Sequence, residues 1–180
     1  MKLLKSSLFL TLTSLVLLYS CDKIEEALSK DISVRNVGFE VITPIEDSES
    51  DTDRNSFSGE ITVDYHDPQF ATFKDYVSFI DKIKVDEVVI ITTSTGNGTM
   101  AQNLNLVSSQ AGVNLTIPSY EFGTEYSNAQ RTTAAESILN AILNKKTVDL
   151  KVSGQTDETQ GNNLTHQILI KSGTVTVKLL

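Results

Sequence analysis

The stretch LTHQILIKSGTVTVKL, residues 164–179, decides the fold class. Its apolar side chains occupy every second position on either side of a Ser172-Gly173 step: Leu164, Ile168, Ile170, Val175, Val177 and Leu179. A period of two residues predicts a β-strand with one buried face, and Ser172-Gly173 predicts a turn or bulge within it. His166 is in phase with the apolar set, so we expect a hydrogen-bonded, half-buried histidine.

The same alternation extends upstream through most of the chain. It predicts further strands over 32–41, 57–65, 85–93, 100–106, 113–117 and 148–152. A change of phase between Val34 and Val37 indicates a bulge, and Pro44 and Pro118 are expected to end their strands. The segment 95–98, Thr-Gly-Asn-Gly, is typical of a hairpin turn.

An amphipathic helix is expected over 68–83, where the apolar spacing changes to three and four residues. Asp67 supplies an N-cap and Pro68 suits the first helical position. The aromatic stripe of this helix includes Phe70, Phe73 and Phe79.

A second helix is expected over 128–144, opened by a capping box of Ser127 and Gln130. Its buried face is formed by Ala134, Ile138, Ala141 and Ile142. About seven or eight strands with two inserted helices predict a mainly β fold, an antiparallel β-sandwich, with a closed β-barrel as the alternative. We expect one β-rich domain over 31–180, because a 39% hydrophobic content is that of a globular chain.

The N-terminus has the pattern of a cleaved signal peptide over 1–20. Lys2 and Lys5 precede an apolar stretch over 8–18, which is shorter than the roughly 18 to 20 residues that a membrane span requires. The peptide ends at Ser20, directly before Cys21, which is the only cysteine in the chain, so no intramolecular disulfide can form.

The tetrapeptide Leu18-Tyr19-Ser20-Cys21 resembles the lipobox of bacterial lipoproteins. The resemblance implies that Cys21 receives a diacylglycerol and that the signal peptidase cuts directly before it. Acyl chains such as palmitate would then anchor the protein, with 21–30 as a lipidated tether. The alternative is an ordinary signal peptide that leaves Cys21 as a free thiol.

The choice of membrane rests on the residues after Cys21. Asp22 resembles the inner-membrane retention signal of enteric bacteria, whereas Lys23 followed by Glu25-Glu26 resembles, imperfectly, the surface-export signal of Bacteroidetes lipoproteins. The Tyr-containing lipobox and the Asn- and Thr-rich chain favour the Bacteroidetes type. We therefore expect the outer membrane, on its periplasmic face or at the cell surface.

The charge of the chain argues against a nucleic-acid partner. The net charge is −8, and removal of Lys2 and Lys5 leaves 13 basic against 23 acidic residues, a net charge of −10. Such a surface repels phosphate backbones. The partners expected instead are the membrane, through Cys21, and a protein, glycan or small ligand.

No set of catalytic, cofactor-binding or metal-binding residues is evident, so we expect no enzyme and no cofactor. The chain has two histidines, His66 and His166, and neither lies in a nucleophile or zinc motif. The paired acids Asp86-Glu87 and Asp157-Glu158 lie at element ends, and the chain has no Trp to stack on a sugar.

An acidic loop carries carboxylates at alternate positions but does not fit the EF-hand template, so we expect a solvated loop, with weak Ca²⁺ binding as the alternative. These carboxylates are Asp47, Glu49, Asp51 and Asp53.

Two functions remain, both non-enzymatic. The first is a cell-envelope lipoprotein that serves as a binding or structural module. The second is a carrier of a lipid or other small apolar ligand, in which the Phe70, Phe73 and Phe79 helix would cover a partly hollow sheet.

Overall fold

The computed structural model describes residues 28–46, 54–144 and 147–178. They form one eight-stranded sheet in which every pairing is antiparallel. The strands are β1 (Ser29–Val34), β2 (Val37–Glu46), β3 (Asn55–Val63), β4 (Ile80–Ser94), β5 (Met100–Ser108), β6 (Val113–Glu121), β7 (Val148–Thr156) and β8 (Asn163–Lys178). The mainly antiparallel β fold predicted from the alternation is confirmed.

Strand β8, which contains the 164–179 pattern, is the centre of the sheet. β4 pairs with it along almost its whole length, from Ile80 opposite Val177 to Ser94 opposite Leu164. β1 and β2 share its other edge and follow one another along it. The predicted bulge between Val34 and Val37 is the break between these two strands, where Asn36 has a φ of 55°.

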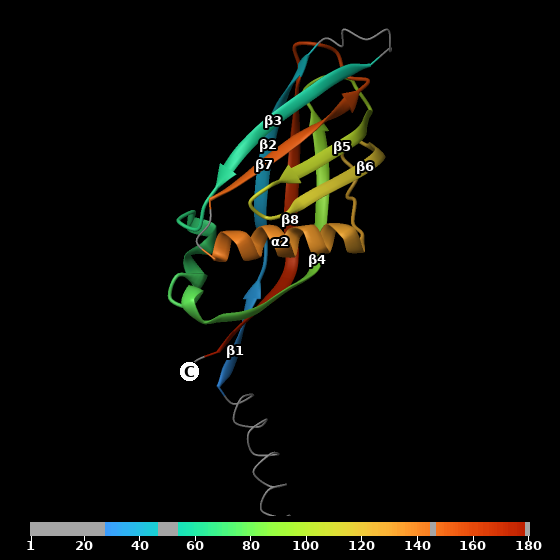
Figure 1. The fold of residues 1–180 in the computed structure, drawn as a ribbon. Helices are drawn as coiled ribbons and strands as arrows, with labels where there is room; N and C mark the ends of the chain where they lie inside the picture. Colours follow the sequence, from blue (N-terminus) through green and yellow to red (C-terminus); the bar gives the residue numbers. More distant parts are fainter. Residues whose placement is uncertain (1–27, 47–53, 145–146, 179–180) are drawn as a thin grey trace, which may run out of the picture.

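The sheet curls so that β3, β7, β5 and β6 face β2, β8 and β4, as in a half-open barrel (Figure 1). Within the described residues the two halves join where β2 meets β3, through the pairs Ile45 with Phe57 and Glu46 with Ser56. Gly59 allows β3 to pass close over β2, because a Cβ there would lie 2.6 Å from the Ile42 carbonyl oxygen. The interior is filled by aliphatic and aromatic side chains from both halves.

The single α-helix among the described residues, α2 (Ala129–Leu143), lies across the curled sheet and packs on β4, β6 and β7 (Figure 1). It covers nearly the range predicted. Its N-cap is Asn128, whose side chain accepts a hydrogen bond from the Arg131 N–H, so the expected capping box of Ser127 and Gln130 is wrong. Its buried face includes the four predicted residues Ala134, Ile138, Ala141 and Ile142.

The other expected helix, an α-helix over 68–83, is wrong, because the segment is not α-helical and its helical part ends before 80. Asp67 does cap a helical start at Pro68, but the segment forms two 3₁₀ turns, Pro68–Phe73 and Val77–Phe79. Ile80 already belongs to β4. Aromatic and β-branched residues have low helix propensity, and pairing with β8 gives Ile80 and Ile83 a better environment.

Two strand ends also differ from expectation. Pro44 lies within β2, which continues to Glu46, and Pro118 lies within β6, which continues to Glu121. Pro118 is tolerated because β6 is the terminal strand of the sheet and the opposite strand is irregular between Gln102 and Asn105. The segment 95–98 connects β4 and β5, but these two strands do not pair with each other, so the predicted hairpin turn is wrong.

The face that points into the core changes at the same level in three neighbouring segments: the β1–β2 segment, β4 and β8. Each carries a polar doublet there, neither member of which is buried, between two buried residues: Arg35-Asn36 between Val34 and Val37, Asp86-Glu87 between Val85 and Val88, and Lys171-Ser172 between Ile170 and Gly173. The doublets lie side by side, because Val34 and Val85 both oppose Gly173 and Val37 and Val88 both oppose Ile170. The Ser172-Gly173 step is thus a change of face inside one long strand, and the β4–β8 register shifts there as in a bulge, so the bulge alternative is confirmed and the turn is wrong.

Candidate functional site

A chain of hydrogen-bonded polar side chains crosses the hydrophobic core. His166 of β8 is fully buried and uses both ring nitrogens, with Nε2 3.0 Å from Thr43 Oγ1 and Nδ1 2.8 Å from Thr92 Oγ1. Thr92 in turn is hydrogen-bonded to the Tyr120 hydroxyl. The ring of Phe57 stacks on the imidazole with 5.0 Å between centroids. These contacts link β2, β8, β4 and β6.

Burial keeps the two titratable side chains of this hydrogen-bonded network, His166 and Tyr120, in their neutral forms. Burial lowers the pKa of His166 to about 3 and raises the pKa of Tyr120 to about 12. Desolvation disfavours the charged form of each group, which is the physical cause of both shifts. A neutral imidazole with both nitrogens engaged holds the sheet together, and it is not exposed to act as a general base.

Arg131, on the first turn of α2, lies near Tyr120 and Tyr126 but is not part of this hydrogen-bonded network. Its side chain is only 3% exposed, and its guanidinium carbon lies 4.3 Å from the centre of the Tyr126 ring. Nε and Nη1 are buried and make no hydrogen bond. Burial lowers the pKa of Arg131, while Tyr126 and Tyr120 oppose that effect.

Tyr126 is fixed by the segment that leads from β6 to α2. Its backbone N–H and C=O both pair with Ile90, and the Gly123 N–H donates to the Thr92 carbonyl. The segment therefore covers part of the outer edge of β4. This arrangement places Tyr126 over the Arg131 guanidinium, with the Tyr120 ring 5.9 Å from that of Tyr126.

A second polar cluster surrounds Glu158, in the connection between β7 and β8. The side chain is 1% exposed and accepts hydrogen bonds from Ser94, Gly98, Thr159 and Asn162. Burial by itself would raise the pKa of Glu158, but these donors lower it to about 2.

The neighbouring Asp157 accepts from the backbone N–H groups of Thr99 and Met100 and from the Thr99 hydroxyl, and its pKa is lowered in the same way. Both acids of this pair thus tie the β7–β8 connection to the β4–β5 turn.

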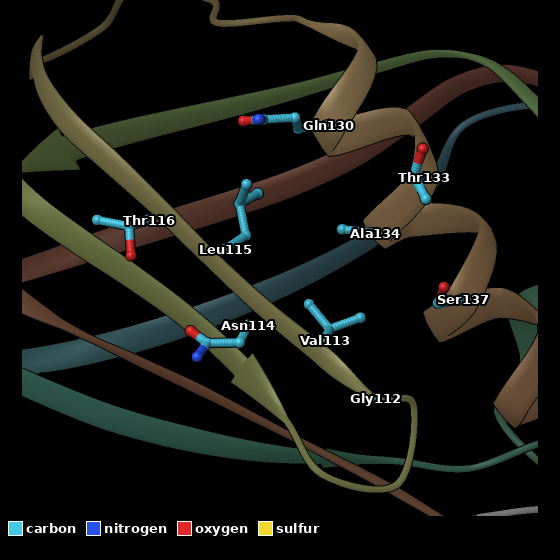
Figure 2. A pocket seen from close by; sticks show the side chains of 9 residues that line it. All are labelled: Gly112, Val113, Asn114, Leu115, Thr116, Gln130, Thr133, Ala134 and Ser137. Atoms are coloured by element: carbon cyan, nitrogen blue, oxygen red, sulfur yellow. The ribbon is translucent and has the colours of Figure 1, made fainter.

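A surface groove of about 480 Å³ lies between β6 and α2. Figure 2 shows that its walls are the start of β6 and one side of the helix; the lining residues are Gly112, Val113, Asn114, Leu115, Thr116, Gln130, Thr133, Ala134 and Ser137. Val113 and Leu115 are 7% exposed and form an apolar floor. The other side chains are hydroxyls, amides and one methyl group, so the groove carries no charge and no aromatic ring.

The residues singled out in the sequence are distributed over the molecule rather than gathered in one site. His66 is exposed, 3.4 Å from Asp64, whereas His166 is buried in the core. Phe70 and Phe73 are buried core residues, and Phe79 is 44% exposed. Leu18, Tyr19, Ser20, Cys21 and the acidic loop residues Asp47, Glu49, Asp51 and Asp53 lie outside the described residues.

The burial of Arg131 was missed in the sequence, although its position relative to the apolar residues of α2 indicates it. Arg131 precedes Ala134 by three positions and Ile138 by seven, so it lies on the buried stripe of α2. Thr92 is likewise in phase with Val88 and Ile90 on β4. A polar residue in phase with an apolar stripe marks a buried polar group.

In the described part of the chain, no helix combines the length and the apolar character needed to span a bilayer. No three His, Cys, Asp or Glu side chains come together within residues 28–46, 54–144 and 147–178 as a metal ion would require. Comparison with protein-family models, with curated proteins and with solved structures found no match to this chain.

Proposed function

We propose that this chain is a non-enzymatic lipoprotein of the cell envelope, anchored in the outer membrane through acylated Cys21, that binds an extended segment of a partner protein. The observation that carries the proposal is the groove between β6 and α2. The binding element would be the outer edge of β6, with α2 as the opposite wall.

The position of β6 favours an extended peptide. It is the last strand in the sheet order, so alternate backbone N–H and C=O groups on its outer side have no neighbouring strand among residues 28–46, 54–144 and 147–178. An added peptide strand gains main-chain hydrogen bonds there, and side-chain pockets supply specificity. The apolar floor at Val113 and Leu115, with hydroxyl and amide groups around it, suits alternate apolar and neutral polar side chains.

The lining of the groove argues against a glycan as the occupant. Sugar sites usually offer an aromatic ring for stacking, and none of the lining residues is aromatic. The acid pair Asp157-Glu158 supports a non-enzymatic function, because both carboxylates accept hydrogen bonds from the β4–β5 turn. The carrier hypothesis gains no specific observation, since Phe70 and Phe73 are packed in the core.

The anchor determines where the partner must be. Cys21 precedes β1 by eight residues, which span at most about 28 Å when fully extended. A domain held this close to the bilayer meets proteins of the same membrane face. Substitution Cys21→Ser is expected to move the protein to the soluble fraction or to leave an unprocessed precursor. Retention in the membrane fraction with unchanged cleavage would contradict the anchor.

The groove is tested by site-specific photo-crosslinking in intact cells. A photoreactive residue at Ser137, on the α2 wall, is expected to give adducts with a peptide from one envelope protein. The matched control places the same residue at Glu60, an exposed position on β3 paired with Lys151. Adducts with sugar, or peptide adducts no more abundant than those of the control, would reject peptide binding in this groove.

A further inference from the structure

The Arg131 guanidinium is a buried positive charge with no charged partner in the part of the chain that the structure describes. Five N–H donors belong to this group, which has no acceptor. Among the described residues no carboxylate lies within ion-pairing distance of it, and Nε and Nη1 are fully enclosed without a hydrogen-bond partner. A buried charge left in this state costs several kcal/mol, and a stacked tyrosine offsets only part of such a cost.

The acidic residues nearest to it along the chain are already engaged. Glu125 pairs with Lys171, and Glu136 accepts a hydrogen bond from the Val85 N–H at 2.9 Å. The ring of Tyr126 stacks on the guanidinium, the ring of Tyr120 lies beside that of Tyr126, and neither residue carries a carboxylate. The missing negative charge is therefore not supplied by this neighbourhood of the fold.

The position of Arg131 adds a second positive feature. It occupies the first turn of the fifteen-residue helix α2, and this turn contains no acidic residue. A helix N-terminus carries unpaired N–H groups and a partial positive charge, so it attracts anions. An arginine there is unfavourable for the helix alone. Both features become favourable together when an anion lies between them.

We propose that Arg131 is the centre of a binding site for an oxyanion, the carboxylate or phosphate group of a ligand, at the N-terminus of α2. Planar guanidinium groups bind such oxygens through two parallel hydrogen bonds. Tyr126, which is 37% exposed, covers the guanidinium and is the side chain that a ligand must displace or slide beneath. This site stands on observations separate from the β6 groove and does not depend on peptide binding there.

The net charge of −8 makes the site easy to test, because an acidic protein attracts few anions non-specifically. The full chain, purified in detergent, is titrated with sodium phosphate, with sodium acetate and with sodium chloride at matched ionic strength. We expect the thermal unfolding midpoint, followed by circular dichroism, to rise by several degrees in phosphate or acetate relative to chloride. A response to phosphate alone identifies a phosphate ligand, and a response to acetate alone identifies a carboxylate ligand.

Two variants locate the response. Arg131→Met keeps the length of the apolar stem and removes the charge, and it is expected to abolish the rise. Arg35→Met, at an exposed arginine bonded to Ser33, is the matched control and is expected to preserve it. An equal rise in Arg131→Met, or no rise above chloride in the unmodified protein, would overturn the proposal.

A direct measurement keeps the proposal testable if Arg131→Met does not fold. The side-chain Nε–H resonance of Arg131 in the unmodified protein is followed by NMR during the phosphate and acetate titrations. We expect it to move and to saturate, while the Arg35 resonance stays in place. An Arg131 resonance that is unaffected by both anions would equally overturn the site.

Discussion

The carboxylate of Glu158 provides a quantitative test of how strongly the β7–β8 connection is held to the β4–β5 turn. One oxygen accepts hydrogen bonds from Ser94 and from the Gly98 N–H at 2.8 Å. The other accepts from the Thr159 N–H at 2.8 Å and from Asn162 at 3.0 Å. In Glu158→Gln an NH₂ group replaces one of these oxygens, so at least one backbone N–H faces a donor instead of an acceptor.

The pKa gives the size of the effect. Hydrogen bonds to the ionised form lower the pKa of Glu158 from 4.5 to about 2. At about 1.4 kcal/mol for each unit of pKa, the folded protein favours the carboxylate over an uncharged side chain by about 3 kcal/mol. We therefore expect Glu158→Gln to lower the free energy of unfolding by about 3 kcal/mol at pH 7, measured by urea denaturation.

The sign of the pH dependence follows from the direction of the shift. The folded pKa of Glu158 lies below the unfolded value, so the stabilisation is complete above about pH 4.5 and is lost as the pH falls toward 2. The difference between the unmodified protein and Glu158→Gln is expected to shrink to about 1.5 kcal/mol at pH 3.

A control separates this cluster from surface charge effects. Glu60→Gln removes an exposed carboxylate paired with Lys151 at 3.1 Å, and such pairs contribute about 0–1 kcal/mol. A Glu158→Gln variant that loses no more stability than Glu60→Gln, or a loss that is the same at pH 3 and pH 7, would refute the reasoning.

Three further predictions concern the core and the turns. Because burial lowers the pKa of His166 to about 3, the unfolded chain takes up a proton below pH 6.5 that the folded one does not. Stability should therefore fall by about 2 kcal/mol between pH 7.5 and pH 5, and His166→Gln should remove that part of the dependence in urea titrations. Phe70→Ala should cost about 3–5 kcal/mol, whereas Phe79→Ala, at a 44% exposed site, should cost under about 1 kcal/mol; equal losses would place both in the core. Gly98→Ala puts a Cβ 2.7 Å from the Glu158 backbone in the β7–β8 connection. It should lower the midpoint of thermal unfolding more than the control Gly112→Ala, because a Cβ at Gly112 meets no atom and adds only the strain of a φ of 66°.

The alternation in the sequence predicted the sheet because burial of one face leaves a period of two that no other structure produces. It identified β8, β5 and the buried face of α2 with nearly correct limits. The strand ends were less accurate, because Pro44 and Pro118 both lie inside their strands, and Pro118 is tolerated by the position of β6 at the end of the sheet order. Local composition could not show those positions, which depend on strand order.

The segment 68–83 shows where helical spacing misleads. Phe70 and Phe73 are buried as the stripe predicted, but 3₁₀ turns place residues three apart on one side as well as an α-helix does.

The hydrogen-bonded network through His166 and the unpaired guanidinium of Arg131 were not predicted for a different reason. Their partners lie on distant strands, and a pattern along one segment cannot show what faces it.

The three polar doublets, at which the buried face of the sheet changes sides, limit which insertions and deletions the fold can accept. Removing one residue from Arg35-Asn36, Asp86-Glu87 or Lys171-Ser172 would restore strict alternation in that strand and turn its remaining apolar side chains toward solvent, while its two neighbours kept their old phase. Length changes at this level are therefore tolerable only when all three strands change together. We expect any relative that preserves the fold to retain the three doublets as a set or to have lost them as a set.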